Sequence, residues 1–366
     1  MRKWMMAGAV MILTPWIVSL CWMRAAGAAM AEEAPALESV LEDRGEAGGN
    51  EAAGEALEAA EAGAEAGEMA AEAAEAGAEA GETAAEAASE DRRIILERDG
   101  VRTYMSLEDY LPGVMVCQID PSCHEEALKC QAVIARTYLY RLMDGRMEIY
   151  EEELDLDYLG DGNGLASGSL SGLSLQEREQ AAAGLKRCRA AAQATAGIVM
   201  KQDDRYLLPL FHRVSAGRTR TGEADYPYLQ SAESRWDEEA EGYWQQFSWS
   251  EGEFAVIISG MDGASPVGEA DLPEQIQTVK KDDAGYMEEI KIGSKTFAGE
   301  DVQYALGLPS ACFSVEGKDG RIIITTRGIG HGYGLSQAGA DAQAREGWGF
   351  EEILQYYYKN IILITE

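Results

Sequence analysis

The sequence is poor in positive charge. It contains 31 Lys and Arg residues against 64 Asp and Glu residues, and its formal net charge is −33. Because no stretch forms a sustained basic patch, we expect no nucleic-acid partner, since binding to phosphates needs clustered cations. The acidic composition likewise argues against electrostatic docking onto anionic lipid.

Cysteine is also scarce, which excludes a disulfide scaffold. There are six cysteines, and one of them, Cys21, lies in an apolar N-terminal run. Cys123 and Cys130 are seven residues apart on a predicted helix, about 10.5 Å along its axis, which is too far for a disulfide. We expect buried or free thiols, no metal and no cofactor. The alternative is a zinc site with ligands drawn from Cys117, Cys123, His124 and Cys130.

A long apolar run occurs only at the N-terminus. Trp4–Met23 follows Arg2 and Lys3 and has the length of a bilayer-spanning helix. We interpret residues 1–31 as a transmembrane signal-anchor. The alternative is a cleaved secretory signal, with Ala29–Ala31 as the small-residue cleavage site. Both interpretations place the rest of the chain outside the cytoplasm.

Residues 32–91 contain almost no large apolar side chains. The 14-residue unit Glu61–Ala74 recurs as Glu75–Ala88 with a single change, Met69 to Thr83. A segment of Glu, Ala and Gly cannot bury enough apolar surface to offset the entropy of ordering it. We therefore predict a disordered acidic tether that joins the anchor to the body of the protein.

Residues 92–366 predict one α+β domain with a helical first part and a strand-rich second part. A hairpin is expected around Asp99-Gly100. A helix is expected from a capping box of Ser122 and Glu125 to Met143, on the apolar stripe Leu128, Ala132, Ala135, Leu139 and Leu142. Further helices are predicted at Leu175–Ala196 and Phe350–Tyr358. Strands are predicted at Ile198–Met200, Tyr206–His212, Phe254–Ser259, Met287–Ile292, Ile322–Thr325 and the final IILIT.

Three stretches of this body carry a resemblance to a known family. They are LPGVMVCQIDPSCHEEALKCQAVIARTYLY (Leu111–Tyr140), TAGIVMKQDDRYLLPLFHRVSAGRT (Thr195–Thr219) and TRGIGHGYGLSQAGADAQAREGWGFEEILQYYYKNI (Thr326–Ile361). In this order and spacing they resemble the SpoIID family of stage II sporulation proteins and the related amidase enhancers. The resemblance covers about residues 92–363.

The resemblance implies an extracytoplasmic protein that acts on peptidoglycan while a forespore is engulfed. Sporulation members of the family are lytic transglycosylases that cut glycan strands stripped of stem peptides, beside a partner amidase or endopeptidase. The expected partners are therefore glycan strands, such an enzyme, and the membrane through the N-terminal anchor. The expected location is the cell membrane, with a single span and the main domain outside.

One position departs from the family pattern. The catalytic glutamate that the resemblance implies falls on Gln118, and an amide has no proton to give at neutral pH. Three explanations are open. The protein is a pseudoenzyme that binds glycan and enhances a partner; or a nearby carboxylate, Asp120 or Glu125, substitutes; or Gln118 acts only electrostatically with weak activity. Capping for Glu125 and a turn for Asp120 are the competing structural roles.

The remaining candidate residues are substrate-binding ones. Glycines alternate through GIGHGYGLSQ (Gly328–Gln337), and this pattern lets a backbone approach a ligand closely. We expect the loop to present His331, Ser336 and Gln337 on a bare rim, in a cleft where Gln118, His212 and His331 converge. The full set of predicted substrate-binding residues is Arg136, His212, Ser215, His331, Ser336 and Gln337.

Overall fold

The computed structural model describes residues 92–98, 100–160, 174–261, 267–268 and 272–366. The chain divides into two units, Met1–Ala88 and Ser89–Glu366, and all described residues belong to the second. The predicted anchor and tether lie outside the described residues. Among the helices that the structure describes, none is both long and apolar enough to cross a membrane.

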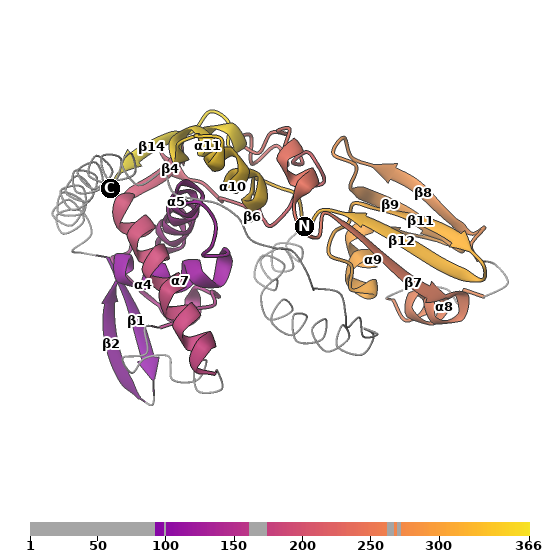
Figure 1. Ribbon diagram of the computed structural model, residues 1–366, viewed down its shortest axis with the longest axis horizontal. Helices are drawn as coiled ribbons and strands as arrows, with labels where there is room; N and C mark the ends of the chain where they lie inside the picture. The colour runs from indigo at the N-terminus through magenta and orange to yellow at the C-terminus, as the bar shows by residue number, and fades with distance from the viewer. Residues whose placement is uncertain (1–91, 99, 161–173, 262–266, 269–271) are drawn as a thin grey trace, which may run out of the picture. The chain divides into compact units, whose positions relative to one another are not determined.

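The first part of the body is a helical core with a small sheet (Figure 1). Strand β1 pairs with β2 in the predicted hairpin and, on its other side, runs parallel to β3. Helices α4, α5 and α7 pack together and bury one continuous apolar cluster that includes Leu111, Val114 and Leu139. The elements are β1 (Arg93–Arg98), β2 (Val101–Ser106), α4 (Leu107–Gln118), α5 (Glu125–Met143), β3 (Glu148–Tyr150), the 3₁₀ turn η1 (Glu151–Glu153) and α7 (Leu175–Ala194).

The C-terminal helices return to this helical part. α10 and α11 pack on α5, and strand β14 pairs with β4, so the chain's last residues complete a second apolar cluster. Strand β13 runs parallel to β6 and brings Ser336 opposite His212. The elements are β4 (Ile198–Gln202), β5 (Arg205–Tyr206), β6 (Phe211–His212), the 3₁₀ turn η2 (Arg235–Glu239), β13 (Leu335–Ser336), α10 (Gln337–Arg345), α11 (Phe350–Tyr357) and β14 (Ile362–Thr365).

The strand-rich part lies between η2 and β13. It has two antiparallel three-stranded sheets, in the orders β11-β12-β7 and β10-β9-β8. Helices α8 and α9 accompany them, and all contribute to a separate apolar core around Phe254, Ile290 and Phe313. The elements are β7 (Trp244–Ser250), α8 (Glu251–Ser259), β8 (Ile276–Lys281), β9 (Met287–Ile292), β10 (Lys295–Ala298), α9 (Gly299–Leu306), β11 (Phe313–Lys318) and β12 (Arg321–Arg327).

The α+β class is confirmed, with local corrections. The strand predicted at Phe254–Ser259 is wrong: this run is helix α8, which begins at the Ser250–Glu253 capping box. The box predicted at Ser122 is also wrong, because α5 begins at Glu125 and His124 is its N-cap. The predicted strand Tyr206–His212 is two short strands, β5 and β6.

Candidate functional site

Gln118 lies at the end of α4, half-buried, in a chain of three amides. Gln131 on α5 donates from Nε2 to Gln118 Oε1 at 2.8 Å. Gln337, the first residue of α10, donates from Nε2 to the Gln118 main-chain oxygen at 2.8 Å and to Gln131 Oε1 at 3.1 Å. Helices α4, α5 and α10 thus meet at one uncharged polar cluster. Gln131 is fully buried and was not among the predicted residues, although it lies in the quoted ALKCQAV motif.

Strand β13 connects this cluster to two histidines. Gln337 follows Ser336, whose register partner in β6 is His212. The rings of His212 and His331 are 5.8 Å apart between centroids. The structure therefore brings His212 beside His331, and Gln118 beside Gln337.

Hydrogen bonds fix different roles for the two imidazoles. His212 Nδ1 lies 3.0 Å from the Tyr333 carbonyl oxygen, so Nδ1 carries the proton and Nε2 is an acceptor. His331 Nδ1 accepts from the Tyr333 main-chain N–H at 3.0 Å. The Nε2 atom of His212 is buried and has no hydrogen-bond partner among the described residues. It is a buried acceptor whose hydrogen-bonding capacity is unused there.

Both histidines are neutral at pH 7. Burial, and then repulsion from the His331 ring when that ring is protonated, lower the pKa of His212 to about 3. Burial, and then the neighbouring Arg220 guanidinium, lower the pKa of His331 to about 4. Two neutral rings can accept or donate hydrogen bonds, but neither is a source of a readily released proton at neutral pH.

Ser215 and Ser336 meet at a buried carboxylate. Both are fully buried; Ser336 donates to Asp237 Oδ1 at 2.7 Å, and Ser215 donates to Asp237 Oδ2 through its hydroxyl and, at 3.2 Å, its main-chain N–H. Burial raises the pKa of Asp237, whereas these serine hydrogen bonds act against that rise. Asp237, which the sequence did not single out, holds the two motif loops together.

The glycine-rich loop packs against protein and not against open space. A Cβ on Gly334 would lie 1.8 Å from the Leu210 carbonyl oxygen, and one on Gly332 would lie 2.5 Å from Tyr286 Oη. Both glycines have positive φ. The prediction that the loop presents Ser336 and Gln337 on a bare rim is wrong, since both side chains are buried. The glycines allow a close approach to neighbouring chain segments, which cover these residues.

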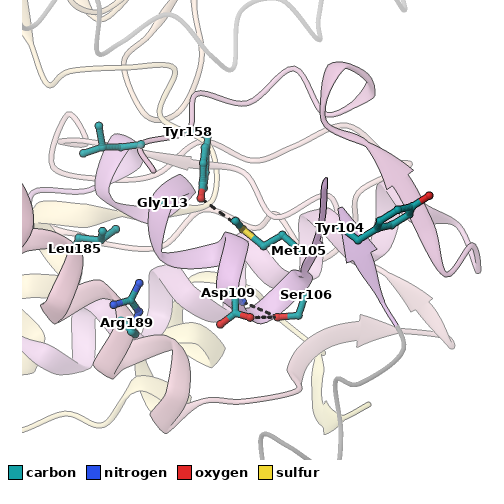
Figure 2. A pocket seen from close by; sticks show the side chains of 9 residues that line it. Tyr104, Met105, Ser106, Asp109, Gly113, Tyr158, Leu185 and Arg189 are labelled. Atoms are coloured by element: carbon teal, nitrogen blue, oxygen red, sulfur yellow. Dashed lines mark hydrogen bonds between the residues drawn. The ribbon is translucent and has the colours of Figure 1, made fainter. Parts of the chain in front are cut away.

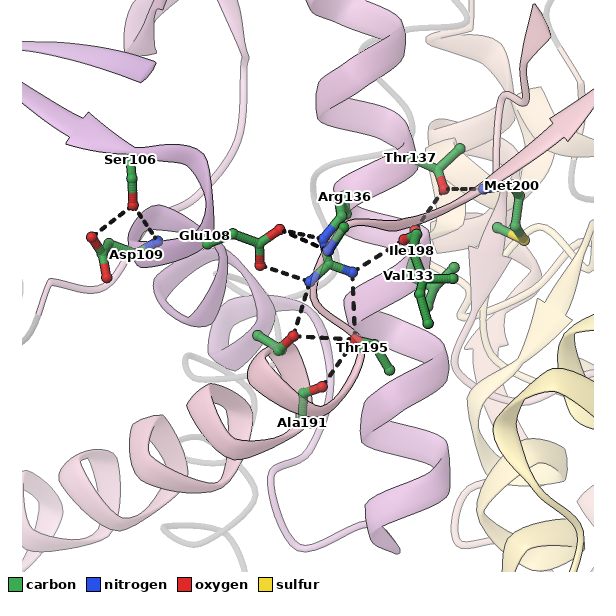
Figure 3. Close-up of polar contacts among 12 residues, drawn as sticks. Ser106, Glu108, Asp109, Val133, Arg136, Thr137, Ala191, Thr195, Ile198 and Met200 are labelled. Atoms are coloured by element: carbon green, nitrogen blue, oxygen red, sulfur yellow. Dashed lines mark hydrogen bonds and ion pairs between the residues drawn. The ribbon is translucent and has the colours of Figure 1, made fainter. Parts of the chain in front are cut away.

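Arg136 is a buried tie between helices (Figure 3). Its guanidinium makes two hydrogen bonds to the Glu108 carboxylate, at 2.6 and 2.7 Å, and three more to Thr195 Oγ1 and the Ile198 and Ala192 carbonyls. These contacts use all five of its donors. Glu108 and Gln118 are ten residues apart on α4, about 15 Å along the axis, so Arg136 and Gln118 lie at opposite ends of that helix.

The two carboxylates considered as substitutes are both exposed. Asp120 Oδ1 accepts the Ser122 main-chain N–H at 2.8 Å, which closes a turn before α5. Glu125 opens α5, where an acidic side chain complements the positive end of the helix dipole. Asp120 therefore has the turn role offered as its competing explanation, whereas Glu125 does not form the predicted capping box, because His124 is the N-cap of α5.

The cysteines are thiols throughout the described residues. Cys117 and Cys123 are half-buried, whereas Cys130, Cys188 and Cys312 are buried. Burial is the largest cause that raises the pKa of the Cys117 and Cys123 thiols to about 12. Within the ranges that the structure describes, no three His, Cys, Asp or Glu side chains are arranged to hold a metal ion.

One cavity of about 270 Å³ lies between β2, α4 and α7 (Figure 2). Its lining mixes apolar and polar side chains, and none of the predicted site residues contributes to it. Gly113 lies against the Tyr158 ring there. The lining residues are Tyr104, Met105, Ser106, Asp109, Gly113, Tyr158, Leu159, Leu185 and Arg189.

Comparison with known proteins agrees with the motif around Gln118. The model of the SpoIID family, stage II sporulation protein, matches residues 98–201. Stage II sporulation protein D of Bacillus subtilis (strain 168) is 31% identical over 263 residues, which cover 69% of this chain and 73% of that protein. Stage II sporulation protein D of Bacillus amyloliquefaciens is 30% identical over 265 residues, 70% of this chain and 73% of the relative. The chain therefore belongs to the SpoIID family of sporulation proteins.

Proposed function

We propose that this protein binds glycan strands of peptidoglycan during engulfment and does not cut them. The strand lies against the amide cluster of Gln118, Gln131 and Gln337, with His212 beside it. Trp4–Met23 anchors the protein in the membrane and the body acts outside the cytoplasm. The observation that carries this proposal is the amide at position 118, held by two further amides.

Cleavage by a lytic transglycosylase needs a carboxylic acid at this position. The acid protonates the leaving glycosidic oxygen, and its carboxylate then takes the proton of the sugar 6-hydroxyl as the 1,6-anhydro ring closes. The Gln118 amide can do neither. His212 and His331, with pKa values of about 3 and 4, hold no acidic proton at neutral pH. The chemistry of the cluster favours recognition without bond breaking.

Sugar hydroxyls suit the groups that remain. A hydroxyl both donates and accepts, so it can donate to His212 Nε2, a buried acceptor without a partner in the described part of the chain. Amides next to it can donate and accept in turn. Since a buried acceptor left unpaired is costly, a ligand that supplies its hydrogen bond gains affinity.

Binding without cleavage makes the protein a scaffold for a partner enzyme. An amidase or endopeptidase of the engulfment machinery would receive strands that this protein holds near the membrane. In this role the protein needs an intact binding face and no acid catalyst.

A lytic transglycosylase with a shifted acid is the second candidate. Asp120 is exposed and stands two residues beyond Gln118. Its carboxylate accepts the Ser122 N–H and closes a turn, and its side chain is exposed, whereas the acid of a transglycosylase has to lie in a cleft.

The test uses the full chain in detergent with peptide-free glycan strands. We expect co-sedimentation with the strands and no 1,6-anhydro products after muramidase digestion. Gln337→Leu should weaken binding, whereas Tyr304→Ala, a change of an exposed residue in the strand-rich part, should not. Anhydro products from the wild type that disappear in Asp120→Asn would establish the second candidate instead.

A further inference from the structure

Three aromatic side chains form a cluster on the surface at the far end of α10. Trp236 of η2, Trp348 of the α10–α11 loop and Tyr356 of α11 are all half-buried. Their ring centroids are 5.6 to 6.1 Å apart, and each pair meets edge to face. We call this trio the aromatic platform.

The platform is held rigidly by its own polar atoms. Trp236 Nε1 donates to Glu346 Oε1 at 2.8 Å, and Tyr356 Oη donates to the Glu233 carbonyl oxygen at 2.7 Å. These bonds leave the rings fixed before any ligand arrives, so little side-chain entropy is lost on binding. A prearranged apolar surface of this kind on a very acidic protein marks a binding site more than a random exposed ring does.

Cations border the platform, although the body as a whole is acidic. The Arg235 guanidinium lies 5.5 Å from the Trp236 ring, and Lys359 Nζ lies 4.8 Å from the Tyr356 ring. Neither cation forms a salt bridge within the described ranges, whereas the nearby Glu233 carboxylate is paired with Arg218 at 3.2 Å. Glu346 brings one carboxylate to Trp236, and Arg235 and Lys359 are two cations beside it that can pair with a carboxylate on the ligand.

Helix α10 connects the platform to the amide cluster. Its first residue is Gln337, which bonds to Gln118, and the residue after its end is Glu346, which bonds to Trp236. Nine residues of helix separate the two places by about 14 Å. Ala338 and Ala342, one turn apart, are partly exposed between them. A polymer that occupies one end is long enough to reach the other.

We propose that the aromatic platform is a second binding site for the same glycan strand, which rests on the proposed function. Sugar rings stack on Trp348 and Trp236, because the axial C–H bonds of a sugar present an apolar face to an aromatic ring. Arg235 and Lys359 pair with carboxylates that the strand carries when its sugars bear free lactyl groups. The platform thereby selects acidic, peptide-free glycan over neutral polysaccharide.

The test measures affinity of the full chain in detergent for two probes of equal length. One is peptide-free peptidoglycan glycan, which carries carboxylates, and the other is a neutral chitin oligosaccharide. Arg235→Gln with Lys359→Gln should weaken binding of the acidic probe about three- to fivefold and leave the neutral probe unchanged. Trp348→Ala should weaken both probes roughly tenfold. Lys318→Gln and Tyr304→Ala, exposed residues in the strand-rich part, are the matched controls and should change neither.

Strand length separates this proposal from the proposed function. Platform variants should lose affinity for long strands and keep wild-type affinity for a disaccharide, which cannot span α10. If the platform variants bind long strands as the wild type does while Gln337→Leu binds weakly, the platform is not a glycan site and the proposed function stands. If the wild type binds neither probe, both the proposed function and the proposal of a second glycan site on the platform are wrong. Circular dichroism of each variant identifies any loss that comes from unfolding.

Discussion

The two ends of α4 hold polar clusters of opposite character. At the N-terminal end, the Glu108 carboxylate meets Arg136 of α5, and the guanidinium has every donor in use and no exposure to solvent. At the C-terminal end, Gln118 contacts Gln131, which like Arg136 lies on α5. This cluster carries no charge, and part of the Gln118 side chain is exposed. The closed, charged cluster fixes the helices against each other, whereas the open, neutral cluster leaves part of the Gln118 side chain available for further hydrogen bonds.

Under the proposed function, this difference separates residues that hold the fold from residues that face a ligand. Both kinds lie in the family motifs, so a motif alone does not distinguish them. Arg136, Ser215 and Ser336 are buried with protein partners, and His212 is buried with an unused acceptor. Hydrogen-bond satisfaction, more than residue type, tells the two kinds apart. The predictions below test this distinction.

The largest effect is expected where one atom change would turn the open cluster into a catalyst. Gln118→Glu places a carboxyl group against Gln131 Nε2 in the same geometry, and general acid–base catalysis contributes about 10²- to 10⁴-fold. We expect 1,6-anhydro products from peptide-free strands, measured by chromatography of the digest. Gln118→Asn, which shortens the side chain without adding an acid, is the control and should remain inactive.

Persistent inactivity of Gln118→Glu despite wild-type strand binding would mean that the site departs from the family by more than one residue. High activity already in the wild type would contradict the proposal that the open cluster only binds glycan, because the cluster would then be catalytic without a carboxyl group at position 118.

Breaking the closed cluster should affect stability strongly. Arg136→Met leaves the Glu108 carboxylate, mostly buried, without its cation, and removal of one partner from a buried ion pair costs about 3–5 kcal/mol. The free energy of unfolding in urea measures this loss. Adding Glu108→Leu should recover part of it, since an apolar pair leaves no unpaired charge. A loss below about 1 kcal/mol for Arg136→Met alone would show that the cluster is not a structural tie.

The histidines make stability depend on pH in the mildly acidic range. The pKa values of His212 and His331 are lowered from 6.5 to about 3 and about 4, so the unfolded chain binds more protons than the folded one between those values. Their contribution is complete above pH 6.5 and falls as pH decreases toward 4. We expect the free energy of unfolding to drop by roughly 2–3 kcal/mol between pH 6.5 and 5, where most carboxylates titrate little.

His212→Gln should halve that slope, and urea melts at five pH values measure it. A slope unchanged from the wild type would mean that folding does not lower the pKa of His212, so that its ring could carry a proton in the folded protein below about pH 6.5.

Local elements were predictable from sequence because their signals are local. The stripe Leu128, Ala132, Ala135 and Leu139 predicted α5, and these residues are buried on it. The start of α5 was missed because Asp120 binds Ser122 in a turn and leaves capping to His124. α8 was read as a strand because FAVII is apolar and rich in β-branched residues, which favour strands in isolation.

The site was predictable as a set of motifs and not as a set of contacts. Gln337 bonds to residues more than 200 positions earlier, and Asp237 joins two serines from separate motifs. Such partners follow from the packing of α10 on α5 and of η2 beside β13, which no spacing in the sequence expresses. Nor does any spacing indicate that Arg136 would be enclosed by main-chain carbonyls from the last turn of α7 and the start of β4.

The smallest effect on stability is expected for Gln118→Met, the same apolar replacement at the open end of α4. It removes one neutral hydrogen bond and leaves the buried Gln131 Nε2 without this acceptor, so the cost is about 1–3 kcal/mol, still below that of Arg136→Met. Glycan binding should nevertheless fall several-fold, measured by co-sedimentation beside Arg136→Met at a temperature where both variants are folded. Arg136→Met should retain binding. If the two variants instead lose stability equally, or if Arg136→Met is the one that loses the strand, then the open and closed ends of α4 do not differ in role.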